Sequence, residues 1–174
     1  MNFRNHIVLC LLAMLVIAGC ASTEVTSRDE LVTGKIPRPN TIWVHDFAAT
    51  SSDVPDKSAL AGQDLEHSTP QTAKEIAMGR QLGDEIASQL IEQINGMGMS
   101  AERASAGTSP QINDIVIQGY LISFNAGSAV KRIAIGFGSG ASDLKVAAEG
   151  FQMTAQGLRK LGSGSTDAEG GKTP

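Results

Sequence analysis

The amino-acid sequence predicts an α+β domain in which one long amphipathic helix packs on a mixed sheet of about four strands. Two observations support this fold class. Short segments rich in β-branched and aromatic residues are separated by polar turns, and one long segment repeats apolar residues every three or four positions. Both kinds of segment fall within residues 41–154 of the 174-residue chain, so we expect one domain there.

The first 19 residues have the layout of a secretory signal peptide. Arg4 precedes an apolar run of twelve residues that ends at Ala18, shorter than the roughly 20 residues of a transmembrane helix. The run closes in Ile17-Ala18-Gly19-Cys20, which resembles the lipobox of bacterial lipoproteins. This resemblance implies cleavage before Cys20 and acyl chains on its thiol and amine, which would hold the protein on a membrane. A permanent transmembrane anchor is the less favoured alternative.

The mature protein is therefore expected to be a lipid-anchored protein of the cell outer membrane that faces the periplasm. The choice of membrane comes from resemblance to bacterial sorting rules, because Ala21 and not Asp follows Cys20. Residues 20–40 are polar and are predicted to form a tether between lipid and domain. Cys10 would leave with the signal, so no thiol would remain for a disulfide, a metal or catalysis.

The domain is predicted to begin with a strand over Thr41 to Phe47. The polar segment 48–69 is too long for a tight connection and is a candidate for contact with a partner. An amphipathic helix is predicted from Pro70 to Met97, capped by Ser68 or Thr69 and stopped by Gly96 and Gly98.

Gly79 and Gly83 lie on the apolar stripe of this helix. We interpret the pair as the place where the helix approaches a strand closely, and helix dimerisation is the less favoured alternative.

Three further strands are expected, over Met99 to Ala104, Asn113 to Phe124 and Leu144 to Thr154. Within the second of these, Gly119 indicates a bulge or a close contact with the helix. Residues 155–174 are rich in Gly, Ser and charged residues and are predicted to be disordered. An edge strand within 155–161 is the alternative.

The composition and motifs speak against several function classes. A net charge of −4 without a basic cluster argues against nucleic-acid binding. His45 and His67 each adjoin an acidic residue, but sequence neighbours do not face each other, and no Gly-x-Ser-x-Gly motif is present. Zinc and calcium ligand patterns are also missing. We therefore expect no catalytic residue, no metal and no cofactor.

One glycine-rich stretch is a candidate for contact with a partner: Gly136, Phe137, Gly138, Ser139 and Gly140. Its backbone amides could also face an anion, but the Lys and Ser or Thr of a phosphate loop do not follow the last glycine. A plain turn is the simplest interpretation.

Taken in order, the lipobox and five segments resemble the bacterial lipoproteins grouped as "domain of unknown function 4410". The segments are Ile42 to Phe47, Gly79-Arg80-Gln81-Leu82, Ile115 to Gly119, Lys131-Arg132, and Gly136 to Gly140. The resemblance implies an envelope lipoprotein with a small α+β domain and no established activity. More distantly, the chain is similar to curli-secretion and peptidoglycan-synthase-activating lipoproteins, which bind or assemble. The chain departs from the family at its end, where Gly and Ser stand in place of the expected last strands.

The function expected from sequence is thus a non-enzymatic component of the envelope. It would contact the membrane through the lipid on Cys20 and bind an unknown envelope protein or associate with itself. The alternative is an enzyme or small-ligand-binding protein that acts on envelope polymers.

Overall fold

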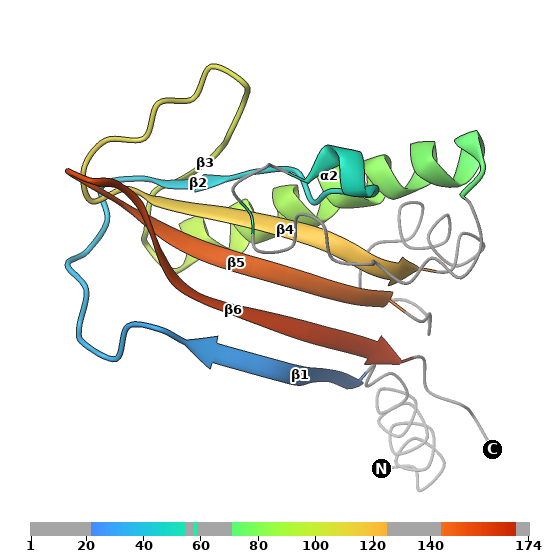
Figure 1. Cartoon of the computed structure of the whole chain (residues 1–174), viewed down its shortest axis with the longest axis horizontal. Coiled ribbons are helices and arrows are strands. Elements are labelled where there is room, and N and C mark those ends of the chain that lie inside the picture. The colour runs from blue at the N-terminus through green and yellow to red at the C-terminus, as the bar shows by residue number, and fades with distance from the viewer. Residues whose placement is uncertain (1–21, 55–57, 59–70, 125–143, 170–174) are drawn as a thin grey trace, which may run out of the picture.

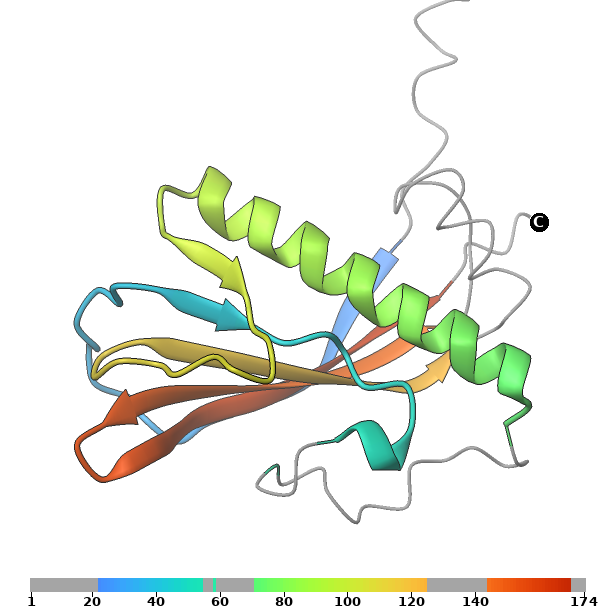
Figure 2. The same cartoon turned by 90° about the horizontal axis from the view of Figure 1, so that it is seen from above.

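A mixed six-stranded sheet with one long helix on one face makes up the fold (Figures 1 and 2). The computed structural model describes residues 22–54, 58, 71–124 and 144–169. In chain order its elements are β1 Ser22–Glu30, β2 Ile42–Val44, the 3-10 helix η1 Ser51–Asp53, α2 Ala73–Gly96, β3 Ala101–Arg103, β4 Ile115–Phe124, β5 Leu144–Thr154 and β6 Gly157–Glu169. The spatial order of the strands is β1-β6-β5-β4-β2-β3.

The predicted fold class, one helix on a mixed sheet, is confirmed, but the number of strands is wrong. The sheet has six strands and not about four. The two additional strands come from segments that we expected to be a tether (20–40) and a disordered tail (155–174). Residues 22–30 instead form β1, and 157–169 form β6, which pairs with β5 on one side and β1 on the other. Main-chain hydrogen bonds along both edges of β6 hold a strand whose Gly and Ser side chains give no hydrophobic alternation.

The sheet divides into a parallel part and an antiparallel part. β2 runs parallel to both of its neighbours, β3 and β4, and α2 forms the connection from β2 to β3. A parallel pair requires such a crossover, and the helix supplies it. β4, β5, β6 and β1 pair antiparallel in that order.

Helix α2 starts later than the sequence predicts. Thr72, and not Ser68 or Thr69, is the N-cap, because its side chain accepts from the Glu75 amide while the Glu75 carboxylate accepts from the Thr72 amide. This reciprocal capping box satisfies two amides that the first helical turn leaves unpaired. The helix ends at Gly96, and Gly98 turns the chain with a φ of +79°.

The predicted role of Gly79 and Gly83 is confirmed. A Cβ on Gly83 would lie 2.0 Å from the main-chain oxygen of Phe47, and a Cβ on Gly79 would lie 2.8 Å from the Cβ of Ala49. Both contacts join α2 to the chain that continues from β2. Gly119 also marks a close contact, but its neighbour is the ring of Phe47, 2.1 Å from an added Cβ, and not the helix. Gly79 and Gly83 therefore set how closely α2 approaches the chain after β2.

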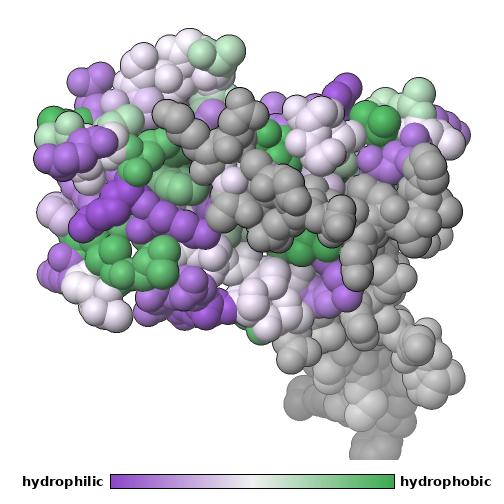
Figure 3. Space-filling model, in the orientation of Figure 1, coloured by the Kyte–Doolittle hydropathy of each residue, from purple (hydrophilic) through white to green (hydrophobic). Residues whose placement is uncertain are grey.

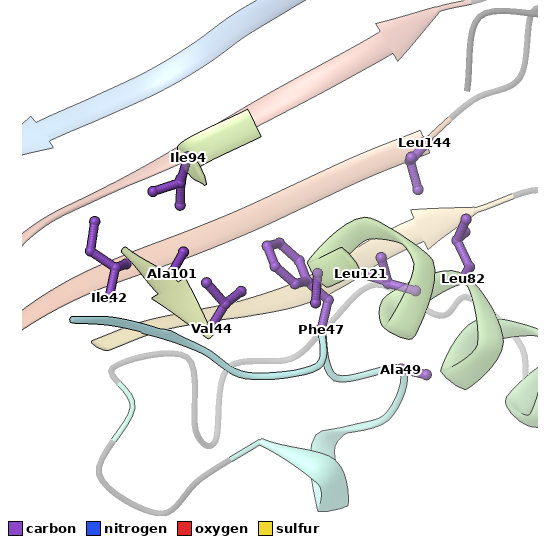
Figure 4. Packing of buried hydrophobic residues seen from close by; sticks show 10 residues of the cluster. Ile42, Val44, Phe47, Ala49, Leu82, Ile94, Ala101, Leu121 and Leu144 are labelled. Carbon is purple, nitrogen blue, oxygen red and sulfur yellow. The ribbon is translucent and has the colours of Figure 1, made fainter. Parts of the chain in front are cut away.

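Hydrophobic side chains fill the space between α2 and the sheet (Figure 4). Val44, Phe47 and Leu121 contribute from the sheet side, and Leu82 and Ile94 contribute from the helix. A smaller cluster lies on the opposite face of the sheet, where η1 also lies (Figure 2), and it is formed by Ala48, Val54 and Tyr120. One helix is about 10 Å wide and six strands span over 20 Å, so α2 leaves part of its face of the sheet uncovered.

The register of the strands defines two ends of the sheet. At one end, Thr23 of β1, Ala168 of β6, Leu144 of β5 and Phe124 of β4 form one row. We call this the proximal end, because β1 starts here. The distal end is the opposite one, with the turn between β5 and β6 where Thr154 pairs with Gly157. At about 3.3 Å per residue, the eleven residues of β5 separate the two ends by about 35 Å.

Candidate functional site

A pocket of about 430 Å³ lies where β3 stops after three residues. The chain that follows β2 continues beside β4 past this point, since the Ala48 amide donates to the Gly119 carbonyl and the Leu121 amide donates to the Ala48 carbonyl. The turn after β3, η1 and α2 form the other walls. The lining residues are His45, Asp46, Phe47, Ala48, Ala49, Asp53, Arg80, Ala104, Ser105, Ala106, Gln118 and Gly119.

A bidentate ion pair closes one side of this pocket. Arg80 of α2 donates from Nη2 to Oδ1 of Asp53 at 2.8 Å and from Nε to Oδ2 at 3.2 Å. The hydrogen bond from Arg80 is the main reason that the pKa of Asp53 lies below its usual value. The same contact raises the pKa of Arg80. The pair joins the helix on one face of the sheet to η1 on the other.

A second arginine connects the remaining walls. Arg103, the last residue of β3, forms an ion pair with Asp46 and reaches the Asp84 carboxylate at 3.1 Å. It also donates to the Asp84 carbonyl at 3.0 Å and to Ser88 Oγ at 2.5 Å. A guanidinium has five donors in a planar fork, so one side chain can join the end of β2, β3 and α2.

Burial is the main cause of the pKa shift of His45, which lines the pocket. Desolvation lowers its pKa, and the nearby negative charge of Asp46 opposes this shift only in part. The imidazole is therefore neutral at pH 7. Within the described part of the chain, no hydrogen bond links the His45 side chain to Asp46 or Ser105, and Ser105 Oγ lies 3.4 Å from Thr108 Oγ1. The pocket thus offers neutral donors and acceptors between two ion pairs.

A buried carboxylate lies on the face of the sheet opposite α2. Glu149 of β5 is 1% exposed, and its Oε1 lies 2.8 Å from Lys160 Nζ in a direction that makes an ion pair but not a directed hydrogen bond. Its Oε2 accepts a hydrogen bond from Ser58 Oγ. The Glu149 side chain therefore holds Ser58 against the sheet.

The distal end of the sheet carries a set of exposed apolar side chains. Among the residues that the structure describes, five large hydrophobic residues are exposed, and four of them lie at or near this end: Leu31, Met97, Ile112 and Leu158. Leu158 pairs with Met153 next to the β5-β6 turn, and Ile112 precedes Asn113, whose amide donates to the Met153 carbonyl. Figure 3 shows hydrophobic patches at this end, on the left of the view. The fifth residue, Val25, lies near the start of β1.

The residues predicted from sequence are only partly within the described structure. Cys20 and the stretch Gly136 to Gly140 lie outside it, as does His67. The predicted contact segment 48–69 is described at 48–54 and at 58, where it holds η1 and Ser58. His45 lies in the pocket.

Sequence reasoning missed the ion pairs and the apolar distal end. Asp53 and Arg80 are 27 positions apart, and no local pattern connects them. Isolated apolar residues such as Ile112 and Leu158 likewise form no pattern in the sequence, and only the pairing of the strands brings them to the same end of the sheet.

Comparison with known proteins identifies the family. The model of the family described as "Domain of unknown function (DUF4410)" matches residues 42–174, and the chain belongs to this family. The match includes β6, so the apparent departure at the end of the chain is corrected. No curated protein matches the chain.

No described helix is long and apolar enough to span a membrane. No group of three or more His, Cys, Asp or Glu side chains among these residues could hold a metal ion.

Proposed function

We propose that the protein is a periplasmic lipoprotein, anchored to the outer membrane through Cys20, that binds a protein partner of the cell envelope or a second copy of itself. In this role it does not catalyse a reaction. The anchor rests on the lipobox sequence Ile17-Ala18-Gly19-Cys20 that closes the signal-like segment. The family to which the chain belongs is described as a domain of unknown function, so membership assigns no activity.

The single observation that carries the binding role is the set of apolar side chains at the distal end. Single exposed apolar residues are ordinary on protein surfaces, but neighbouring ones are typical of an interface, and Ile112 and Leu158 both lie next to the position of Met153 in β5. Ile112 is 64% exposed, and Leu31 is 55% exposed. Burying such side chains against a partner contributes about 25 cal/mol for each Å² removed from water.

The chemistry of the pocket supports binding over hydrolysis. Arg80, which lines the pocket, and Arg103, next to its wall, are each joined to carboxylates, so Asp46 and Asp53 act as ion-pair partners. A hydrolase of the serine type would need a base that touches both its nucleophile and an orienting acid. His45 makes neither contact with the described groups around it.

Site-specific crosslinking in intact envelopes tests this proposal. A benzophenone amino acid at Ile112 or at Leu158 should capture the same protein, either one partner or a second copy. The matched control is Val25, which is 63% exposed against 64% for Ile112 but lies near the start of β1. Ile112→Asp should abolish capture from Leu158 while the fold is retained. Equal capture from Val25, or capture of unrelated proteins at each position, contradicts a distal binding surface.

Lipidation has its own test. Mass spectrometry of the mature amino terminus should show an acylated Cys20, and Cys20→Ser should release the protein from the membrane fraction. A Cys20→Ser protein that is still acylated and still sediments with membranes would refute the anchor.

The pocket favours a second candidate function, the binding of a small polar ligand from envelope polymers. Its volume of about 430 Å³ falls within the usual range of ligand sites, and His45 and Gln118 offer neutral hydrogen-bonding groups. Calorimetry with soluble peptidoglycan fragments tests this function. Binding that is lost in Gln118→Ala, with crosslinking at Ile112 unchanged, would favour it over the partner-binding role.

A further inference from the structure

The guanidinium of Arg80 keeps one of its hydrogen-bonding edges free. Arg80 donates to Asp53 from Nε and Nη2, which together form one edge of the guanidinium fork. The other edge, formed by Nη1 and the second N–H of Nη2, makes no hydrogen bond to a described residue. The side chain lines the pocket and is 60% exposed, so a ligand can reach this edge. Asp53 holds the guanidinium in place, and a carboxylate fits such an edge with two parallel hydrogen bonds.

The wall at the end of β2 carries an excess of negative charge. Arg103 forms ion pairs with two carboxylates, Asp46 and Asp84, so one guanidinium serves two negative charges. Asp46 uses Oδ1 for its ion pair, and its Oδ2 has no partner among the described residues. The Asp46 side chain lines the pocket and is 62% exposed. An ammonium group is the ligand group that fits this free oxygen.

The rest of the pocket offers polar groups without charge. Gln118 and Ser105 supply an amide and a hydroxyl. Burial lowers the pKa of His45, so its imidazole is neutral at pH 7. Amides, hydroxyls and a neutral imidazole donate to and accept from peptide groups. The pocket volume of about 430 Å³ falls within the usual range of ligand sites.

We propose that this pocket binds a short peptide that carries both a free carboxylate and a free amine. The carboxylate binds the free edge of Arg80, and the ammonium group binds Asp46. The site has two arginines against three carboxylates, Asp46, Asp53 and Asp84, so an amine on the ligand balances the excess negative charge. The proposal rests on the second candidate function, the binding of a small polar ligand, and it assigns the charged groups of that ligand.

Three matched peptides test the two contacts separately. N-acetyl-alanyl-lysine has a free carboxylate and a free amine, N-acetyl-alanyl-norleucine lacks the amine, and N-acetyl-alanyl-lysine amide lacks the carboxylate. Each peptide is titrated into the full chain in detergent, and the NMR shifts of the pocket amides give the dissociation constants. The first peptide should bind about fivefold more tightly than either of the others, which is the effect expected of one exposed ion pair.

Substitutions identify which ligand group each side chain binds. Asp46→Asn should remove the preference for the amine and keep the preference for the carboxylate, and Arg80→Met should do the reverse. A preference is the ratio of two dissociation constants in the same variant, so a general loss of affinity cancels from it. Glu92→Gln removes an exposed carboxylate of α2 that does not line the pocket, and this matched control should keep both preferences.

Two results would contradict the assignment of the charged groups. These are equal binding of the three peptides to the natural protein, and a preference that survives the substitution of its proposed contact. Either one overturns the proposal and leaves the small-ligand function standing. If none of the peptides shifts the pocket amides, the small-ligand function fails together with the proposal. Crosslinking at Ile112 judges the partner-binding role independently of these titrations.

Discussion

Gly83→Ala is the sharpest test of how helix and sheet fit together. The added methyl group would lie 2.0 Å from the main-chain oxygen of Phe47, and real Cβ atoms do not approach other atoms within 3.0 Å. Helix and chain must therefore separate by about 1 Å. Neither side of this contact is a flexible side chain, so the strain cannot relax by a change of rotamer.

The cost follows from three contributions. Overpacking of a close contact costs up to about 3 kcal/mol, and the hydrogen bond from the Phe47 amide to the Gly83 carbonyl, 3.3 Å long, contributes about 1 kcal/mol that would be lost. Alanine gains about 1 kcal/mol of helix propensity over glycine. We expect a net loss of about 3 kcal/mol in the free energy of unfolding, which in a urea titration lowers the midpoint by about 2 M.

Gly96→Ala is the matched control in the same helix. A Cβ at Gly96 has no neighbour within 4 Å, so only the propensity gain applies. We expect this variant to be as stable as the natural protein or up to about 1 kcal/mol more stable. If Gly83→Ala is also neutral or stabilising, the close packing of α2 on the chain after β2 is wrong.

Three further substitutions or titrations test the pocket and the buried carboxylate. Glu149→Ala should lower the free energy of unfolding, measured by urea denaturation, by about 2–3 kcal/mol, because Lys160 loses its ion-pair partner. A decrease of less than about 0.5 kcal/mol would contradict a structural role for Glu149. The ion pair with Arg80 lowers the pKa of Asp53 in the folded protein. The stabilisation that this pair gives the fold is therefore complete at pH values above the pKa of an unfolded Asp, about 4, and it is lost as the pH falls through the lower pKa of the folded protein. Arg80→Met should remove this part of the acid dependence of stability, and an unchanged acid profile would refute the pair. Burial lowers the pKa of His45, so its NMR titration midpoint in the folded protein should lie below 6.5, and stability from this group should fall as pH drops below 6.5; a midpoint above that value would contradict its burial.

Local sequence signals predicted the elements whose side chains carry the packing. The apolar stripe of α2 and the β-branched run of β4 place hydrophobic groups at fixed spacings, so Ile94 and Leu121 could be assigned to apolar faces that the structure buries. Gly79 and Gly83 were interpretable for the same reason, because a small residue on an apolar stripe leaves space for a neighbour.

The missing strands could not be predicted because long-range pairing stabilises them. β6 contains Gly162, Ser163, Gly164 and Ser165, a composition that local propensity assigns to a flexible tail. Its neighbours β5 and β1 supply the hydrogen bonds, and β1 lies more than 130 positions away along the chain. The pocket was unpredictable for a related reason, since Asp53 and Arg80 meet only after α2 crosses from β2 to β3.

The small side chains of β6 also affect how firmly β1 is held. Where Ser27 and Arg28 pair with Ser165 and Gly164, the side chains of the two strands meet through hydroxyl hydrogen bonds at an exposed edge, and the side chains of residues 25–30 are exposed. Segments of this kind open at low free energy and exchange their amides early. If β1 separates from β6, the chain between Cys20, the proposed lipid anchor, and β2 becomes a link of about 20 residues that reaches up to about 65 Å. The pairing of β1 with β6 would then determine how far the domain can move from the membrane.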